Sequence, residues 1–336
     1  MSLQDRIIEE VLSHYAKRNE AVEELAELLH VGKDAVYRRL RGESMLRPDE
    51  IALLAKTYHF SLDALLSPKS GKISFSFNQF INPVRSFENY LEGILQSIEM
   101  AHQLQDAHLY YASMEIPVFH YMFFPGLISF KLYAWGLTSW DFEFLEKMDF
   151  HFELVPPPAL AISREIVRLY QFLPSTELWS LNIVDNTLNQ IEYILTIGRF
   201  RDPNDALVLC DQALQLIAHM RHMAKHGAKF SLQGGAGNSS APFHLYHNEL
   251  VSTNNTILLS SRQGTHLFTT FENPNFLITT DPVLCRHSEQ WLQKIIGKSN
   301  GISAHSEKNR QWFFNRLEKK VQTTRKHLEL VIEEQA

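Results

Sequence analysis

The feature that most constrains the fold is a pair of short helical patterns separated by only three residues. The first pattern has its apolar residues at helical spacing: Val22, Leu25, Ala26, Leu28 and Leu29. His30-Val31-Gly32 interrupts it, and a second helix is expected from Lys33 to about Arg41, before Gly42. Two helices packed across so short a turn need a small residue in the first helix, apolar anchors around the turn and a β-branched anchor in the second. Ala26, Leu29 with Val31, and Val36 meet these needs, so the sequence predicts a helix-turn-helix.

Further helical patterns flank this pair. One covers Leu3 to Lys17, and another starts with Pro48 in its first turn, where the missing N–H costs nothing. Ser61 is a suitable cap for a short fifth helix from Leu62 to Leu66. We therefore expect a five-helix domain over residues 1–68. Residues 69–82 are predicted to form a linker or arm, in which 73–77 alternate apolar and polar residues with the period of a strand.

Residues 83–230 are predicted to form a helical domain of hairpins that serves dimerisation or sensing. Its expected helices are Val84–Gln105, Asp106–Glu115, Pro125–Trp135, Ser139–His151, Pro158–Phe172, Ser175–Gly198 and Asn204–His226. The Gly- and Ser-rich stretch within 227–242 predicts a mobile loop or a domain boundary.

Residues 243–336 change in character and predict a smaller α+β domain. Four antiparallel strands are expected, rich in β-branched and aromatic residues: Phe243–Val251, Thr256–Ser260, His266–Phe271 and Phe276–Thr280. Two helices follow, Asp281–Ile296 and Ser306 to about Glu334. The expected fold class of the whole chain is mainly α.

Charge and composition limit the classes of function. The chain is 45% hydrophobic and 21% charged, as in globular proteins, with no apolar run long enough for a membrane span and no signal peptide at the start. Its two cysteines, Cys210 and Cys285, are far apart in sequence, which argues against a disulfide framework or a zinc ribbon. We therefore expect a cytoplasmic protein that does not bind membranes.

Positive charge is concentrated on one short element. The net charge is −6, and residues 1–68 hold nine Lys/Arg against twelve Asp/Glu. Residues 33–47, however, contain only two acidic residues, Asp34 and Glu43. The same segment contains five basic residues: Lys33, Arg38, Arg39, Arg41 and Arg47. Attraction to phosphate acts locally, because salt screens charges beyond about 8–10 Å. This element is therefore the expected DNA-binding surface, although a charge run is often only a solvated helix face.

The stretch from Leu25 to Glu43 resembles the Cro/cI-type (XRE-like) helix-turn-helix family, and the resemblance extends over about residues 5–67. It implies a sequence-specific transcriptional regulator that binds double-stranded DNA as a homodimer, because two half-sites one helical turn apart add their affinities. The groove-facing positions that it implies are Gly32, Lys33, Asp34, Tyr37 and Arg38, with Arg41 near the helix end.

Lys33 and Arg38 are the best donors to bases or phosphates among these positions. Arginine can pair bidentately with guanine. Arg41, Arg47 and Lys56 are assigned to the DNA backbone, and Tyr37 to a thymine methyl or a phosphate.

Two residues depart from the family pattern. His30 stands where the turn usually has glycine, and Arg39 occupies a position late in the second helix that is usually apolar. Either departure could shift the register of the individual contacts.

No catalytic constellation, cofactor motif or metal site is expected. His244 and His247 are three residues apart on an expected strand, so they point to opposite faces. The aromatic stretch 116–135 could line an effector pocket, although such stretches more often form core or a dimer interface. The region after residue 69 is expected to bind a small-molecule or protein effector, to oligomerise, or both. The alternative function is a protein-interaction scaffold whose helix-turn-helix does not bind DNA.

Overall fold

The computed structural model describes residues 2–15, 17–58, 60–62, 65, 73–232, 234, 240–250 and 254–335. The chain divides into two compact units, Met1–Ser74 and Phe75–Ala336. We call the first the head and the second the body.

The head is helical, as expected. Its helices are α1 (Leu3–Ser13), α2 (Arg18–Leu28), α3 (Lys33–Leu40) and α4 (Pro48–Thr57). They enclose one apolar core, whose most buried members are Ile7, Val11, Val22, Leu25, Val36 and Leu54. The expected fifth helix, 62–66, lies mostly outside the described residues.

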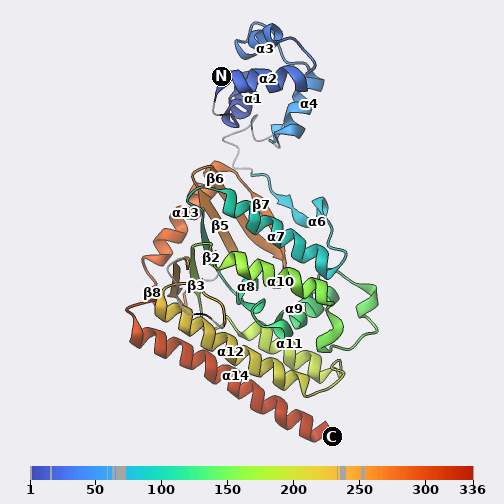
Figure 1. The fold of residues 1–336 in the computed structure, drawn as a ribbon, viewed down its shortest axis with the longest axis vertical. Coiled ribbons are helices and arrows are strands. Elements are labelled where there is room, and N and C mark those ends of the chain that lie inside the picture. The colour runs from blue at the N-terminus through green and yellow to red at the C-terminus, as the bar shows by residue number, and fades with distance from the viewer. Residues whose placement is uncertain are drawn as a thin grey trace. The chain divides into compact units, whose positions relative to one another are not determined.

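The body is a mixed α/β structure built on one eight-stranded sheet (Figure 1). Its strands are β1 (Ser76–Phe77), β2 (His108–Ala112), β3 (Ser175–Trp179), β4 (Phe243–His247), β5 (Thr256–Ser261), β6 (Gly264–Glu272), β7 (Asn275–Thr279) and β8 (Asn300–Gly301). The strand order is β1-β7-β6-β5-β2-β3-β4-β8. β2, β3 and β4 are parallel to one another, and the remaining neighbours pair antiparallel.

Helices cover both faces of this sheet. The larger layer contains α7 (Phe87–Gln103), α8 (Val118–Tyr121), α9 (Pro125–Thr138), α10 (Pro157–Tyr170), α11 (Asp185–Thr196), α12 (Asp205–His226) and α14 (Glu307–Gln335). On the opposite face α13 (Pro282–Ile296) packs a second apolar cluster against β5 and β6 (Figure 1). A short helix, α6 (Asn78–Ile81), follows β1, and two 3₁₀ turns lie at Glu143–Leu145 and Phe152–Leu154.

This sheet contradicts one expectation. The predicted helical middle section and the predicted α+β section are not separate. The segment expected as helix Asp106–Glu115 contains β2, and the first five residues expected in helix Ser175–Gly198 are β3. Both strands lie in the centre of the sheet, so residues 83–230 and 243–336 share one core. All five residues of β3 are buried. Its first three residues are Ser175, Thr176 and Glu177, a combination typical of a capped helix start, so the local pattern indicated a helix.

Two further expectations need correction. Residues 139–151, expected as a helix, contain only the 3₁₀ turn Glu143–Leu145. The four expected C-terminal strands are present, but only β5, β6 and β7 form an antiparallel set; β4 instead pairs parallel to β3. Helices α13 and α14 are confirmed, and 76–77 form the short strand β1 that alternation in the arm indicated.

A buried ion pair holds the helical layer together. Lys131 in the middle of α9 is fully buried and pairs with Glu115. Glu115 also accepts hydrogen bonds from Asn186 Nδ2 and Asn273 Nδ2, both at 2.9 Å. Burial opposes ionisation of Glu115, but the Lys131 charge and these hydrogen bonds outweigh it and hold the carboxyl pKa below its ordinary value. One carboxylate thereby links α9, α11 and the turn between β6 and β7.

We predict that Lys131→Met lowers the free energy of unfolding of the body by about 3–5 kcal/mol, because it leaves Glu115 buried and unpaired. Burial then raises the Glu115 pKa, so the variant regains stability as the pH falls from 7 to 5. The wild type behaves oppositely, losing this contribution only as the pH falls below about 4.3, where free Glu titrates. Urea unfolding followed by tryptophan fluorescence is the measurement, since all five tryptophans lie in the body.

The matched control is the double variant Glu115→Gln/Lys131→Met, which removes both charges. It should recover most of the stability lost in the single variant. A double variant as unstable as Lys131→Met would contradict this assignment.

Candidate nucleic-acid interface

Helices α2 and α3 form the expected bihelical unit. The anchors that the sequence indicated are in place, with Leu29 and Val36 buried and Ala26 and Val31 packed against the same core. Gly32 precedes α3 in extended conformation, with a φ of −69°. The residues at the start of α3 are therefore carried on a rigid frame and face away from the core.

His30 occupies the special position in the turn. Its φ is +52°, the left-handed region that favours glycine, and its side chain is exposed. A non-glycine residue in this region carries strain of about 1 kcal/mol or more. The histidine thus takes the conformation for which glycine is usual, and α3 begins at Lys33 as expected.

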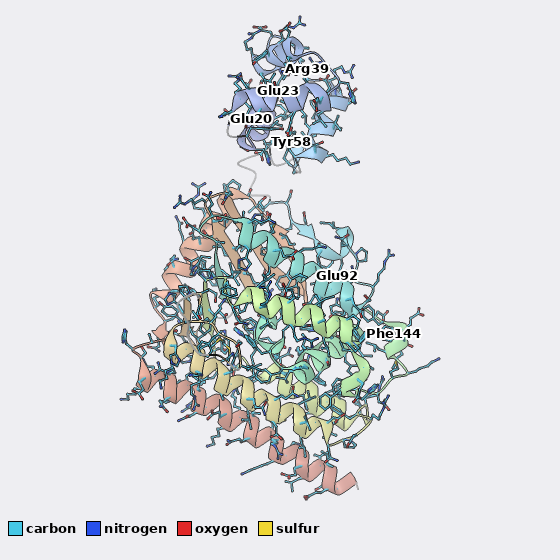
Figure 2. The ribbon with its side chains drawn as sticks, viewed as in Figure 1. Glu20, Glu23, Arg39, Tyr58, Glu92 and Phe144 are labelled. Carbon is cyan, nitrogen blue, oxygen red and sulfur yellow. The ribbon has the colours of Figure 1, made fainter. Side chains whose placement is uncertain are left out.

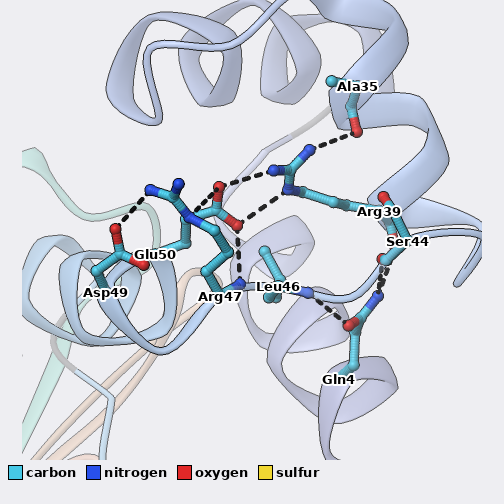
Figure 3. A network of polar contacts seen from close by, with 8 residues as sticks. All are labelled: Gln4, Ala35, Arg39, Ser44, Leu46, Arg47, Asp49 and Glu50. Atoms are coloured by element: carbon cyan, nitrogen blue, oxygen red, sulfur yellow. Dashed lines mark hydrogen bonds and ion pairs between the residues drawn. The ribbon is translucent and has the colours of Figure 1, made fainter.

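Arg39, the second departure, turns inward rather than toward a partner molecule. Its guanidinium donates to both carboxylate oxygens of Glu50, at 3.0 and 2.7 Å, and to the Ala35 carbonyl at 3.1 Å (Figure 3). The Glu50 side chain is only 4% exposed. Burial opposes its ionisation, but the hydrogen bonds from Arg39 and from the Arg47 backbone outweigh it and hold the Glu50 pKa below its ordinary value. This pair fixes α3 against α4.

Gln4 of α1 fixes the segment that follows α3. Its amide nitrogen donates to the carbonyls of Arg39 and Ser44, and its amide oxygen accepts from the Leu46 N–H at 2.8 Å (Figure 3). Sequence reasoning missed both Gln4 and Glu50. Each is a polar residue on a helix, and no local pattern distinguishes such a residue from one that faces solvent.

The residues assigned to DNA contact are placed as follows. Lys33, Asp34, Arg38, Arg41 and Arg47 are exposed, and Tyr37 is half-buried with its hydroxyl 3.4 Å from Asn19 Oδ1. They come from α3, from the segment after it and from the residue before α4. The exposed residues are thus available to a partner.

Most of these cations already have an acidic partner. Lys33 pairs with Glu23 of α2 at 2.5 Å, Arg41 with Glu43 at 2.8 Å and Arg47 with Asp49 at 2.5 Å. The hydrogen bond from Lys33 lowers the Glu23 pKa, and the same bond raises the Lys33 pKa. Each pair is solvent-exposed and contributes little to stability, so a phosphate can displace the carboxylate.

Arg38 differs from the other cations. No hydrogen bond or ion pair joins its guanidinium to another residue within the described part of the chain. An exposed, uncompensated guanidinium on a rigid helix is the strongest candidate for a base or phosphate donor.

Acidic residues border this surface. Glu20, Glu23, Glu24 and Glu27 of α2 are all exposed, and Figure 2 labels the first two of them in the head. We call these four glutamates the acidic row. Among the described residues, Lys33 forms an ion pair with one member of the row, Glu23.

The body offers no comparable site among its described residues. The aromatic stretch 116–135 is core: α9 is buried on nearly every side. A cavity of about 10 Å³ lies at the ends of β2 and β3, lined in part by Ser113, Trp179 and Asn248, which is room for about one water molecule. No cluster of three or more potential metal ligands occurs in the described ranges. His244 is exposed and His247 buried, as expected for opposite faces of β4.

Comparison of the chain with models of known protein families, with curated proteins and with solved structures found no match. Within the portion that the structure describes, no helix is both long and apolar enough to cross a membrane.

We predict that Arg39→Met destabilises the head by about 3–5 kcal/mol, because Glu50 is left buried without its cation. Hydrogen exchange of α3 and α4 amides in the full chain should accelerate by a factor of 100 or more. Arg41→Met is the matched control, since its partner Glu43 is exposed and its loss costs about 0–1 kcal/mol. Equal effects of the two substitutions would show that the Arg39–Glu50 pair does not hold α3.

Proposed function

We propose that the chain is a sequence-specific DNA-binding transcriptional regulator of the Cro/cI-type helix-turn-helix class. One observation carries this proposal. The exposed face of α3 presents the uncompensated Arg38 and the displaceable Lys33, while the buried Arg39–Glu50 pair holds the helix in a fixed orientation. A rigid helix that presents exposed cations, Lys33 at its start and Arg38 in its last turn, can meet the base edges and phosphates of the major groove.

In this proposal α3 enters the major groove. Arg38 pairs with a guanine edge, Lys33 contacts a base or phosphate, and Asp34 and Tyr37 border them. Arg41 and Arg47, on the segment between α3 and α4, fix the register by contacting phosphates. On binding, phosphate oxygens replace the carboxylates of Glu23, Glu43 and Asp49.

The body then supplies a second function. One small head gives weak and mostly non-specific binding, whereas two heads on half-sites about 34–36 Å apart add their affinities. We therefore assign homodimerisation to the body, with response to a small-molecule or protein effector as its further role. The expected location is the cytoplasm, without a cofactor and without catalysis.

The exposed acidic row on α2 favours the alternative, a protein-interaction scaffold. Its four glutamates repel phosphate and would suit a basic protein partner. Selection of bound sequences from a pool of random duplex DNA separates the two functions. An enriched inverted repeat supports the regulator, whereas no enrichment at low salt from folded protein rejects it in favour of the scaffold.

We predict that Arg38→Ala weakens binding to the selected sequence by about 5- to 150-fold, equivalent to about 1–3 kcal/mol, and relaxes the preference at one base position. Fluorescence anisotropy with the selected duplex and with single-base variants measures both effects. Arg286→Ala, at an exposed arginine of α13 in the body, is the control and should leave binding unchanged. A uniform loss across all sequences would instead assign Arg38 to a phosphate.

We predict that Glu23→Gln strengthens DNA binding several-fold, because it releases Lys33 and removes a negative charge beside the phosphates. The slope of log affinity against log salt should steepen by up to about 0.9, the contribution of one additional neutralised phosphate. Binding titrations at several salt concentrations provide the measurement. Glu9→Gln on α1 is the control for a general charge effect. An equal gain in both variants would argue against a specific Glu23–Lys33 competition.

A further inference from the structure

An exposed aromatic patch lies where the body begins. Phe77 of β1 contacts Phe80 and Phe271 edge to face, with ring centroids 5.0 and 5.6 Å apart. Phe80 is 86% exposed and Phe271 63% exposed, although both are large apolar residues. Phe75 and Ile81 next to them in sequence are also exposed. We call Phe75, Phe77, Phe80, Ile81 and Phe271 the arm patch.

Its area is large for a surface that faces water. If a fully exposed large apolar side chain presents about 200 Å², Phe75, Phe80, Ile81 and Phe271 together expose about 500 Å². This is near the upper end of the largest apolar patches on monomers, and such patches commonly mark interaction sites. It would also supply more than half of the roughly 800 Å² that each partner buries in a standard interface.

The segment that supplies four of the five arm-patch residues carries no charge, whereas Glu272 beside Phe271 is charged and exposed. Residues 73–84, Ile-Ser-Phe-Ser-Phe-Asn-Gln-Phe-Ile-Asn-Pro-Val, include no acidic or basic residue. β1 is moreover the terminal strand of the sheet. Proteins usually carry lysine or other charged residues on such an edge strand, and these charges prevent association with another chain. A segment without charge can meet a copy of itself across a two-fold axis without repulsion. The composition therefore fits self-association better than a strongly charged partner.

The position of the arm patch in the sequence favours the same partner. Phe75 is the first residue of the body, and the head ends just before it. Two bodies joined at this patch would bring their first residues together. The ten residue steps from Leu65 to Phe75 can span at most about 35 Å, so two such segments are long enough to reach half-sites about 34–36 Å apart.

We infer that the arm patch is the homodimer interface, joining two copies of the chain through the first residues of the body, α6 and the tip of β6. The inference deepens the proposed function, since it names the surface that brings two DNA-binding heads together. Phe80 and Phe271, the most exposed aromatic members, form its centre.

The experiment is sedimentation of the full chain at micromolar concentrations without DNA. The wild type should be a dimer, and Phe80→Glu and Phe271→Glu should each weaken dimerisation at least tenfold. The matched control is Tyr193→Glu on α11, an aromatic residue with the same 63% exposure as Phe271, which should remain dimeric. Tryptophan fluorescence checks that each variant is folded.

A charge swap guards against indirect effects. Phe80→Glu and Phe80→Lys proteins should each be monomeric alone, and an equimolar mixture should form the heterodimer. A monomeric wild type would overturn the inference. Dimers that survive Phe80→Glu and Phe271→Glu but dissociate with Tyr193→Glu would also overturn it.

The same proteins separate this inference from the proposed function. Dimerisation through the arm patch without retention of any DNA sequence supports the inference and rejects the regulator. Sequence-specific retention by a wild-type monomer supports the regulator and rejects the inference.

Discussion

A buried carboxylate must find its partners inside the protein, and this constraint organises both units. In the head, Glu50 is held by Arg39 and by a backbone N–H, and the pair joins α3 to α4. In the body, Glu115 joins α9 to α11 and to the turn between β6 and β7. A third carboxylate, Glu177 of β3, accepts from His120, Tyr170 and Trp179. Because an unpaired buried charge costs several kcal/mol, each group disfavours arrangements of the surrounding elements that would leave it unpaired.

Ion pairs between the same types of residue do not hold the fold together where they lie on the surface of the head. There the ion pairs of Lys33, Arg41 and Arg47 are exposed, contribute little to stability and can exchange their carboxylates for another anion. Arg39 and Arg38 are neighbours in sequence, yet one is committed to the fold and the other carries no partner among the described residues. Burial alone distinguishes them, and it divides a run of similar cations into a structural group and a candidate binding group.

Sequence reasoning succeeded where helices and strands show their own period. Helices α1 to α4, α13 and α14 and strands β5 to β7 follow from spacing, caps and turn residues. It failed at β2 and β3, because each strand has only five residues and β3 begins with Ser-Thr-Glu, a combination typical of a helix start. At the candidate interface it identified the exposed cations but not Gln4 or Glu50, whose contacts lie 35 to 42 and 11 residues away in sequence.

The sequence by itself determined the local features: the bihelical pattern, the turn at His30–Gly32, the cations of 33–47 and the uncharged run 73–84. These depend on neighbours within a few residues, for which helix periodicity and charge counting are sufficient. The tertiary structure alone decided that β2 and β3 join the C-terminal strands in one sheet and that the Arg39 side chain, only 14% exposed, pairs with the buried Glu50. It also decided that Phe80 and Phe271 both contact Phe77 and remain exposed. Such outcomes depend on which residues far apart in the sequence pack against one another and bury apolar surface or charge together. Local periodicity contains no information about these long-range contacts.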